Sequence, residues 1–310
     1  MKDKSVSDHW NDIFNDYSIL ETIKKDGCFY ISAQEIKKHK EPRLMTKFDH
    51  SKNRPEIFKK NKLGILPVDN GMYVIGKFSL YKTLPKTEDD KPKFMKLPSF
   101  LESIDPENIY SENNALNVAL LSGMISDLVG EDVYETISGR MRSSKFSFYV
   151  NSENEKSHIE VKKPQIEIDG GFESTNNIIV VEAKNSQPED FIIRQLYYPY
   201  RFWKMKVNKE ILPVFFTYKN GVYTFYIYKF KEDDNYSSIE LVEKLSYVID
   251  YENIHIIKRN KLDMQTEGKD VPFPQADTFN RVKELIDLIA DGYKTAKEIA
   301  EFYDIAQRQG

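Results

Sequence analysis

An aspartate and a Glu-x-Lys triplet lie thirteen residues apart near the middle of the chain, on either side of a polar turn. Asp169 ends the strand-like run 166–169, and Glu182 and Lys184 close the apolar run that begins with 178–181. Because side chains alternate along a strand, Glu182 and Lys184 point to one side, and a hairpin would bring Asp169 beside them. Two carboxylates and an ammonium at the end of a buried sheet are costly to desolvate unless a divalent cation shares their charge. The pattern favours a metal-dependent phosphodiesterase over an exposed edge with alternating charges.

Two further acids are candidates for the same site. Glu167 shares the face of Asp169 by strand alternation and is the rival ligand, ranked second because the spacing to the Gly-Gly turn suits Asp169 better. Glu112 follows Ser111, a plausible N-cap, and heads a row of apolar residues at every fourth position (116, 120, 124 and 128). It is either a first-turn acid favoured by the helix dipole or a buried active-site acid, and we favour the second.

The histidines and the cysteine offer no comparable site. The five histidines (His9, His39, His50, His158 and His255) show no recognisable ligand spacing, so we expect neither a histidine metal site nor a triad. The single Cys28 excludes a disulfide framework and fits a reducing, cytoplasmic setting.

Composition narrows the class of protein. With 310 residues, 40% hydrophobic and 30% charged, the chain is typical of a globular protein of two or three domains. The longest nearly apolar stretch, 115–125, is far too short to span a bilayer, so we expect no membrane partner. The first residues lack the hydrophobic core of a signal peptide, and no targeting is implied.

Positive charge is concentrated near the N-terminus. The net charge is −4, yet the window 35–62 holds ten lysines and arginines against four acids, which leaves −10 on the rest of the chain. A local basic patch on an acidic protein suits binding of a polyanion, and a solvated lysine-rich face is an equal alternative when the window is taken alone. The candidate DNA contacts are Arg43, Lys47, Lys52 and Arg54, together with Arg140 and Arg142 before the first expected strand of the core.

The elements that must position these groups divide the chain into three parts. Residues 1–105 predict an α/β domain with a hairpin at Asn70-Gly71, and we expect it to contribute to DNA recognition. Residues 106–262 predict the core that carries the acids. Two capped helices within 277–310 resemble the start of a winged helix-turn-helix, which we expect to be truncated, with a small capping helical pair as the alternative.

Within the core, the helix after Ser111 precedes three antiparallel strands expected at 145–150, 158–169 and 177–184. A capping box at Ser186 predicts a crossover helix toward residue 206, kinked near Pro199. A second hairpin follows, with strands at 212–218 and 222–230. The aromatic residues on the crossover helix are expected to pack in the core rather than stack on bases: Tyr197, Tyr198, Tyr200, Phe202 and Trp203.

This order of helix, three antiparallel strands, crossover helix and strand resembles the core of the PD-(D/E)XK nucleases. Four further segments are similar to a group of type II restriction endonucleases: Arg43-Leu-Met-Thr-Lys-Phe-Asp49, Ile65-Leu-Pro67, Tyr73-Val-Ile-Gly76 and Ala306-Gln-Arg-Gln-Gly310. The likeness spans most of the chain. One departure is Ile168, which stands where the family motif has proline.

The resemblance implies a type II-like restriction endonuclease, which hydrolyses duplex DNA at specific sequences and leaves 5′-phosphate and 3′-hydroxyl ends. Asp169, Glu182 and the carbonyl of Ala183 would bind Mg²⁺, and Lys184 would hold the attacking water or the scissile phosphate. Glu112 matches the upstream helix acid of some members.

One active site cuts one strand, so a homodimer on duplex DNA is expected. Gln195, on the crossover helix, could orient a water or phosphate. Two alternatives remain at this stage: a repair or junction-specific nuclease with the same core, and a non-catalytic DNA-binding regulator whose winged helix is the working part.

Overall fold

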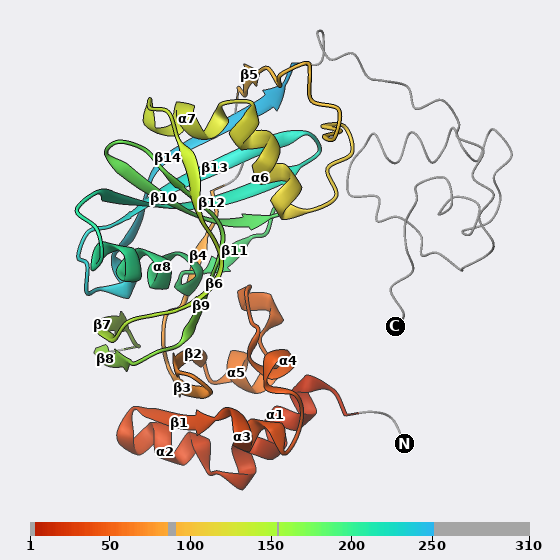
Figure 1. Cartoon of the computed structure of the whole chain (residues 1–310). Helices are drawn as coiled ribbons and strands as arrows, with labels where there is room; N and C mark the ends of the chain where they lie inside the picture. Colours follow the sequence, from red (N-terminus) through yellow and green to blue (C-terminus); the bar gives the residue numbers. More distant parts are fainter. Residues whose placement is uncertain (1–3, 86–90, 154, 251–310) are drawn as a thin grey trace, which may run out of the picture.

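The chain folds as a mixed α/β protein with several sheets, as the sequence predicts (Figure 1). The computed structural model describes residues 4–85, 91–153 and 155–250. The segment 277–310, in which the sequence predicts part of a winged helix, lies outside the described residues. Among the helices of the described ranges, none has both the length and the apolar character needed to cross a bilayer.

The first part of the chain forms a small α/β unit, called here the N-terminal unit (residues 4–76). Its strands pair in the order β1-β3-β2, and Gly71 at φ +74° makes the predicted Asn-Gly turn between β2 and β3. The Trp10, Phe14 and Phe58 rings pack edge to face in its core. Its elements are α1 (Val6–Asp16), α2 (Ile19–Asp26), β1 (Cys28–Ser32), α3 (Ala33–Lys37), α4 (Pro42–Thr46), η1 (Ser51–Asn53), α5 (Glu56–Lys60), β2 (Gly64–Asp69) and β3 (Met72–Gly76).

The main sheet of the described residues has seven strands in the order β5-β14-β13-β12-β10-β9-β6. Strands β6, β9 and β10 form an antiparallel meander, and β10 runs parallel to β12, which follows it through helix α8. The sheet strands are β5 (Lys93–Met95), β6 (Tyr134–Arg142), β9 (Gln165–Glu173), β10 (Asn177–Lys184), β12 (Glu210–Lys219), β13 (Val222–Phe230) and β14 (Ile239–Ile249).

Helices cover both faces of this sheet. Side chains of α6 (Glu112–Leu121) and α7 (Met124–Val129) pack with Ile179 and Val181 of β10, whereas those of α8 (Arg194–Lys204) pack with Ile178 and Val180. Because side chains alternate along a strand, Glu182 belongs to the face that α8 covers.

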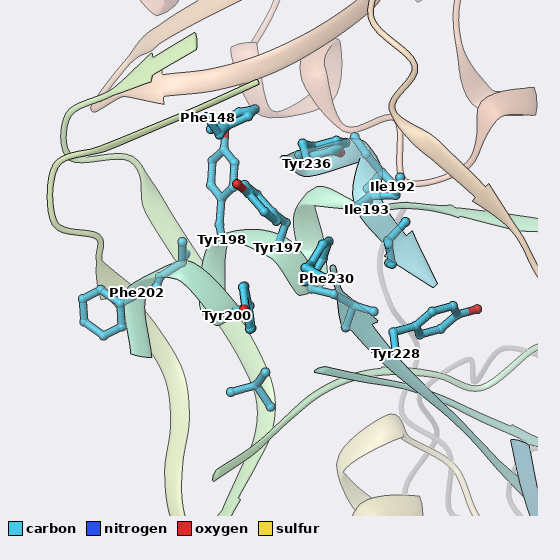
Figure 2. Close-up of a cluster of buried hydrophobic side chains, with 14 of the residues drawn as sticks. Phe148, Ile192, Ile193, Tyr197, Tyr198, Tyr200, Phe202, Tyr228, Phe230 and Tyr236 are labelled. Atoms are coloured by element: carbon cyan, nitrogen blue, oxygen red, sulfur yellow. The ribbon is translucent and has the colours of Figure 1, made fainter. Parts of the chain in front are cut away.

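The aromatic side chains of α8 pack in the core, as predicted. Figure 2 shows Tyr197 and Tyr198 near Phe148 and Tyr236, and the Tyr197 and Phe148 ring centroids are 5.1 Å apart. Tyr197, Tyr198, Tyr200 and Phe202 are all buried, and Trp203 is partly buried against the same cluster. These rings anchor α8, the helix after β10 and the short segment that follows it, in the core and are not free for base stacking.

The predicted helix after Ser111 is two helices. The Ser111 hydroxyl accepts a hydrogen bond from the Asn114 N–H (3.1 Å), so the predicted N-cap is confirmed. The chain then turns at Gly123, whose φ of +81° separates α6 from α7. The four-residue apolar row continues across this break, which is why it predicts a single helix.

The predicted first and second strands of the meander are wrong. Residues 145–150 lie in β7 (Phe146–Asn151), which pairs with β8 (Lys156–Val161) in a separate hairpin, and the expected strand 158–169 is divided between β8 and β9. The first meander strand is instead β6, a sheet edge with mostly exposed side chains. An exposed edge strand lacks the apolar alternation by which a strand is recognised in sequence. Arg140 and Arg142 therefore lie in this strand rather than before it.

The predicted start of the crossover helix is also wrong. Ser186 caps no helix; the chain instead forms the short strand β11 (Asp190–Ile192), which pairs with β4 (Tyr81–Thr83), and α8 begins at Arg194. Pro199 does lie inside this helix. The hairpin of β12 and β13 is confirmed, with Asn220 (φ +52°) and Gly221 (φ +78°) at its turn.

Candidate active site

Strands β9 and β10 bring Asp169 and Glu182 together. Their last paired residues are Gly170 and Val181, so the next step of the register sets Asp169 opposite Glu182. In place of a further ladder bond, the Asp169 carboxylate accepts a hydrogen bond from the Ala183 N–H (Oδ2 to N, 2.9 Å). The side chain of one strand end is thereby fixed to the backbone of the other.

Lys184 closes the site from the end of β10. Its Nζ donates one hydrogen bond to Glu182 Oε1 and another to the carbonyl oxygen of Ala183, at 3.0 Å. The lysine side chain is 15% exposed and that of Glu182 8%, so the ion pair is almost fully buried. The ammonium is therefore hydrogen-bonded to Glu182 and to the Ala183 carbonyl, two of the three groups that the nuclease resemblance implies as cation ligands.

The glycines between the two acids allow the strands to approach closely. A Cβ on Gly171 would lie 2.6 Å from the Ile137 Cβ of β6, and one on Gly170 would lie 3.1 Å from Leu116 Cδ1 of α6. Real Cβ atoms do not approach other carbons to 2.6 Å without displacement, so β6 can lie this near to β9 only because residue 171 has no side chain. Strand β9 is thereby packed closely between β6 and α6, and its Asp169 is bonded to β10.

Two amides connect the surrounding helices to this strand end. Gln195, in the first turn of α8, donates through Nε2 to Glu182 Oε1, and its own Oε1 is buried without a hydrogen-bond partner among the described residues. The Asn185 amide, with its oxygen turned toward α6, accepts from the backbone N–H groups of Ser111 (3.3 Å) and Glu112 (3.1 Å). The unpartnered oxygen of Gln195 is an acceptor that a water in the site would satisfy.

Burial raises the pKa of three acids of the site. It raises the pKa of Glu182 to about 7, against the opposing effect of Lys184. Burial also raises the pKa of Asp169, partly offset by the Ala183 N–H, and that of Glu112, partly offset by Lys184. The pKa of Lys184 would fall on burial, but the Glu182 carboxylate raises it overall. The lysine stays protonated, and the acids gain most from a cation that would share their charge.

These groups face a cavity of about 710 Å³ between the N-terminal unit and the main sheet, called here the cleft. Tyr198 fixes the two parts together, since its hydroxyl donates to the Pro67 carbonyl (2.9 Å). The charged residues that line the cleft are Lys37, Glu41, Arg43, Lys47, Asp49, Asp69, Glu112, Arg140, Glu167, Asp169, Glu182, Lys184 and Arg194. Glu112 is therefore placed in the cleft with the other three predicted catalytic residues.

The six predicted DNA contacts separate into two groups. Arg43, Lys47 and Arg140 line the cleft, whereas Lys52, Arg54 and Arg142 do not. Arg54 is engaged within the N-terminal unit: Nε donates to the Ser51 carbonyl and Nη1 to the Leu63 carbonyl, both at 3.1 Å. Its position indicates a structural role.

The rival acid Glu167 has a different partner. Its side chain is 56% exposed and accepts from Arg140 Nε at 3.1 Å, at the rim of the cleft. Asp169, by contrast, is half-buried against Ala183, and Lys184 affects its pKa. The geometry favours Asp169 as the acid that acts with Glu182.

Sequence reasoning missed Arg194 and the role of Asp49 at the cleft. Arg194 is the first residue of α8 and lines the cleft. Because the sequence predicts that this helix begins near Ser186, it gives no reason to place Arg194 at a helix start beside the site. Asp49 follows α4 and its carbonyl accepts from the Ile192 N–H (3.0 Å), which joins the basic window to β11. Only the long-range pairing of these segments reveals them.

Comparison with known families divides the chain at the end of β3. Residues 76–248 match a family described as a domain of unknown function (DUF6997), and residues 7–75 match a second one (DUF6996). No curated protein and no solved structure matches the chain.

Proposed function

The chain belongs to the DUF6997 family of domains of unknown function, and from the geometry of its cleft we propose that it is a divalent-cation-dependent endonuclease of duplex DNA. One observation carries this proposal. The Lys184 ammonium contacts both Glu182 Oε1 and the Ala183 carbonyl, while Asp169 is hydrogen-bonded to the same Ala183 residue. Three oxygen groups that can bind a metal ion, from Asp169, Glu182 and Ala183, thus lie beside the buried Lys184 ammonium at one strand end.

The donor set fits a hard divalent cation. Carboxylate and carbonyl oxygens are the ligands that Mg²⁺ prefers, and it keeps several waters. Asp169, Glu182 and the Ala183 carbonyl would hold it, and the unpartnered Gln195 oxygen would accept a hydrogen bond from a water nearby. When bound, the cation would offset the charge that develops on the phosphate and lower the pKa of a water.

The protein's own residues would do the rest of the work. The protonated Lys184 would leave the carboxylate for the scissile phosphate or the attacking water, a task suited to a compact ammonium. Gln195 would keep Glu182 oriented through the hydrogen bond to Oε1. Glu112, whose pKa is raised by burial and lowered by the nearby Lys184, would bind further waters or a second cation.

The order of elements supports the same proposal. Helix α6, the meander β6-β9-β10, the crossover helix α8 and the parallel strand β12 occur in the order that the PD-(D/E)XK resemblance implies, with α7 before β6, the β7–β8 hairpin between β6 and β9, and β11 before α8. The acids lie on the second and third strands of this meander. We propose that the core is of this type, and that the enzyme is a type II-like restriction endonuclease.

The N-terminal unit would supply the DNA contacts beside the scissile bond. Arg43, Lys47 and Arg194 face the cleft, where they can neutralise phosphates on either side of the site. A single site formed by Asp169, Glu182 and Lys184 would cut one strand, so two chains would be needed to cut both strands, and we propose a homodimer on DNA.

A cleavage map on a sequenced plasmid tests the proposal. The purified protein is incubated with supercoiled plasmid and Mg²⁺, with EDTA as the control, and the fragment ends are sequenced. Discrete fragments at fixed positions, with 5′-phosphates, are expected. Cutting only at branched substrates would instead identify a junction or repair nuclease, and DNA binding without cutting, unchanged by Lys184→Met, would identify a regulator.

A further inference from the structure

A second group of chemically reactive side chains lies on the N-terminal unit, far along the chain from the Glu-x-Lys site. His9, Asp12 and His39 each offer one ligand atom, and these three atoms all lie within 4.8 Å of one another. The histidine pattern in the sequence predicts no metal site, because only His9 and Asp12 are close in sequence. His39 reaches them through the packing of the segment after α3 against α1.

The local structure explains how the three residues meet. His9 and Asp12 are three positions apart in α1 (Val6–Asp16), so they share one face of the helix. The chain after α3 holds His39 through the backbone bond from the His39 N–H to the Ile36 carbonyl (3.0 Å). The His39 ring is 16% exposed, and its Nε2 lies 3.4 Å from Asp16 Oδ2 on the same helix. The ring is thus oriented toward α1 by a neighbouring carboxylate.

We propose that His9, Asp12 and His39 bind a divalent first-row transition metal, with Zn²⁺ as the preferred ion. Two imidazole nitrogens and one carboxylate oxygen are a typical three-residue ligand set for Zn²⁺, with a water in the fourth position. Ligands at about 2.1 Å in a tetrahedron lie about 3.4 Å from one another. The three ligand atoms lie within 4.8 Å of one another, so side-chain rotations that bring them closer by at most about 1.4 Å complete the site. Such an ion would join α1 to the segment after α3.

The Lys4 ammonium occupies part of the proposed metal site. Lys4 Nζ forms an ion pair with Asp12 Oδ2 at 2.7 Å, and the side chains of both residues are well exposed. Exposed ion pairs contribute little to stability, so Zn²⁺ can displace the ammonium at small cost. Lys4 is therefore a competitor for the metal, which makes its removal an informative test. The proposal stands independently of the nuclease function.

The experiment uses the full chain and Zn²⁺ alone as the probe. Isothermal titration is carried out on the Asp169→Asn variant in excess Mg²⁺, so that the candidate active site does not contribute, and thermal unfolding is followed in parallel. One equivalent of Zn²⁺ is expected, with a melting temperature that rises with the Zn²⁺ concentration. Added His9→Ala or His39→Ala should weaken binding by at least about tenfold.

Two further variants protect the conclusion from a folding defect. Asp12→Asn keeps the shape of the side chain and should weaken Zn²⁺ binding, whereas Lys4→Met removes the competitor and should tighten it several-fold. The matched control is His158→Ala, an exposed histidine on β8, which should bind Zn²⁺ as the parent does. Equal Zn²⁺ affinity in the parent, Asp12→Asn, His9→Ala and His39→Ala would overturn the proposal. Unchanged Zn²⁺ affinity in Lys4→Met would overturn it as well.

Discussion

The Lys184 ammonium donates a hydrogen bond to Glu182 Oε1 from two residues farther along the same strand, and both side chains are almost fully buried. The same ammonium reaches the Ala183 carbonyl at 3.0 Å. In this state the lysine neutralises the charge of the carboxylate. A divalent cation bound by the same oxygens would release the lysine toward the cleft, which relates cation binding directly to the availability of the ammonium.

Lys184→Met should separate cation binding from cleavage. The methionine fills a similar volume but cannot hold a water or a phosphate, so the cleavage rate should fall at least about 100-fold. Mg²⁺ binding should be as tight as in the parent or tighter, because the competing ammonium is absent. Single-turnover cleavage and Mg²⁺ titration measure the two effects, and a loss of both together would mean that the lysine supports the cation site instead.

Asp169→Asn should abolish cleavage, while Glu167→Gln changes it only by a few-fold. The asparagine can still face the Ala183 N–H through its oxygen, so the strand ends stay paired, but its negative charge is lost. Glu167 is exposed and pairs with Arg140 at the rim of the cleft. Cleavage rates of the two variants, with circular dichroism as the check on folding, give the answer; activity retained in Asp169→Asn would move the ligand assignment to Glu167.

Cleavage at low Mg²⁺ should increase as the pH rises through about 7. Burial raises the pKa of Glu182 to about 7, and only the ionised carboxylate can hold a cation. Saturating Mg²⁺ should shift the profile to lower pH, since the cation favours the ionised form. Rates measured across this range at two Mg²⁺ concentrations test the idea, and superimposable profiles would contradict it.

Without a bound cation, Glu182 should make the free energy of unfolding fall as the pH rises, whereas the cleavage rate should increase. Between the ordinary value of 4.5 and about 7, the folded carboxyl keeps a proton that the unfolded one loses. The free energy of unfolding contributed by this group therefore falls as the pH rises through that window. Glu182→Gln removes the titration, so its denaturant midpoint should vary less with pH than that of the parent.

Arg43→Ala and Lys47→Ala should each weaken DNA binding and reduce the slope of log affinity against log salt by about 1. Both residues line the cleft, whereas Lys52 is exposed outside it. Lys52→Ala is thus the matched control, with a smaller expected effect. Fluorescence anisotropy at several salt concentrations makes the comparison, and an equal loss for Lys52→Ala would place the DNA path beyond the cleft.

Gly171→Ala should destabilise the fold by about 1–3 kcal/mol, because the new methyl group overpacks the interface between two strands. Its Cβ would lie 2.6 Å from Ile137 Cβ and 3.1 Å from the Ile137 carbonyl oxygen. Gly170→Ala is the control, since its nearest neighbours are side-chain atoms of Leu116 and Phe172 at 3.1 Å, which can shift. Denaturant unfolding measures both; a larger loss for Gly170→Ala would contradict the explanation.

Much of the site could be predicted because its key contacts are local. Alternation along β10 places Glu182 and Lys184 on one face, and a hairpin of this length sets Asp169 opposite Glu182. The Asn-Gly turns and the Ser111 cap were equally readable, since each depends on a few consecutive residues. The exposed edge strand β6 was missed because its sequence lacks the apolar alternation that marks a half-buried strand.

The sequence by itself determined which carboxylates and which ammonium meet at the end of β10 and which residues turn the chain there. Only the tertiary structure decided that Gln195 reaches Glu182, that Arg43 and Lys47 face the cleft while Arg54 supports its own unit, and that His39 meets α1. The physical reason is that alternation and capping act over a few residues. Contacts between distant segments depend instead on how whole elements pack, which no short stretch of sequence specifies.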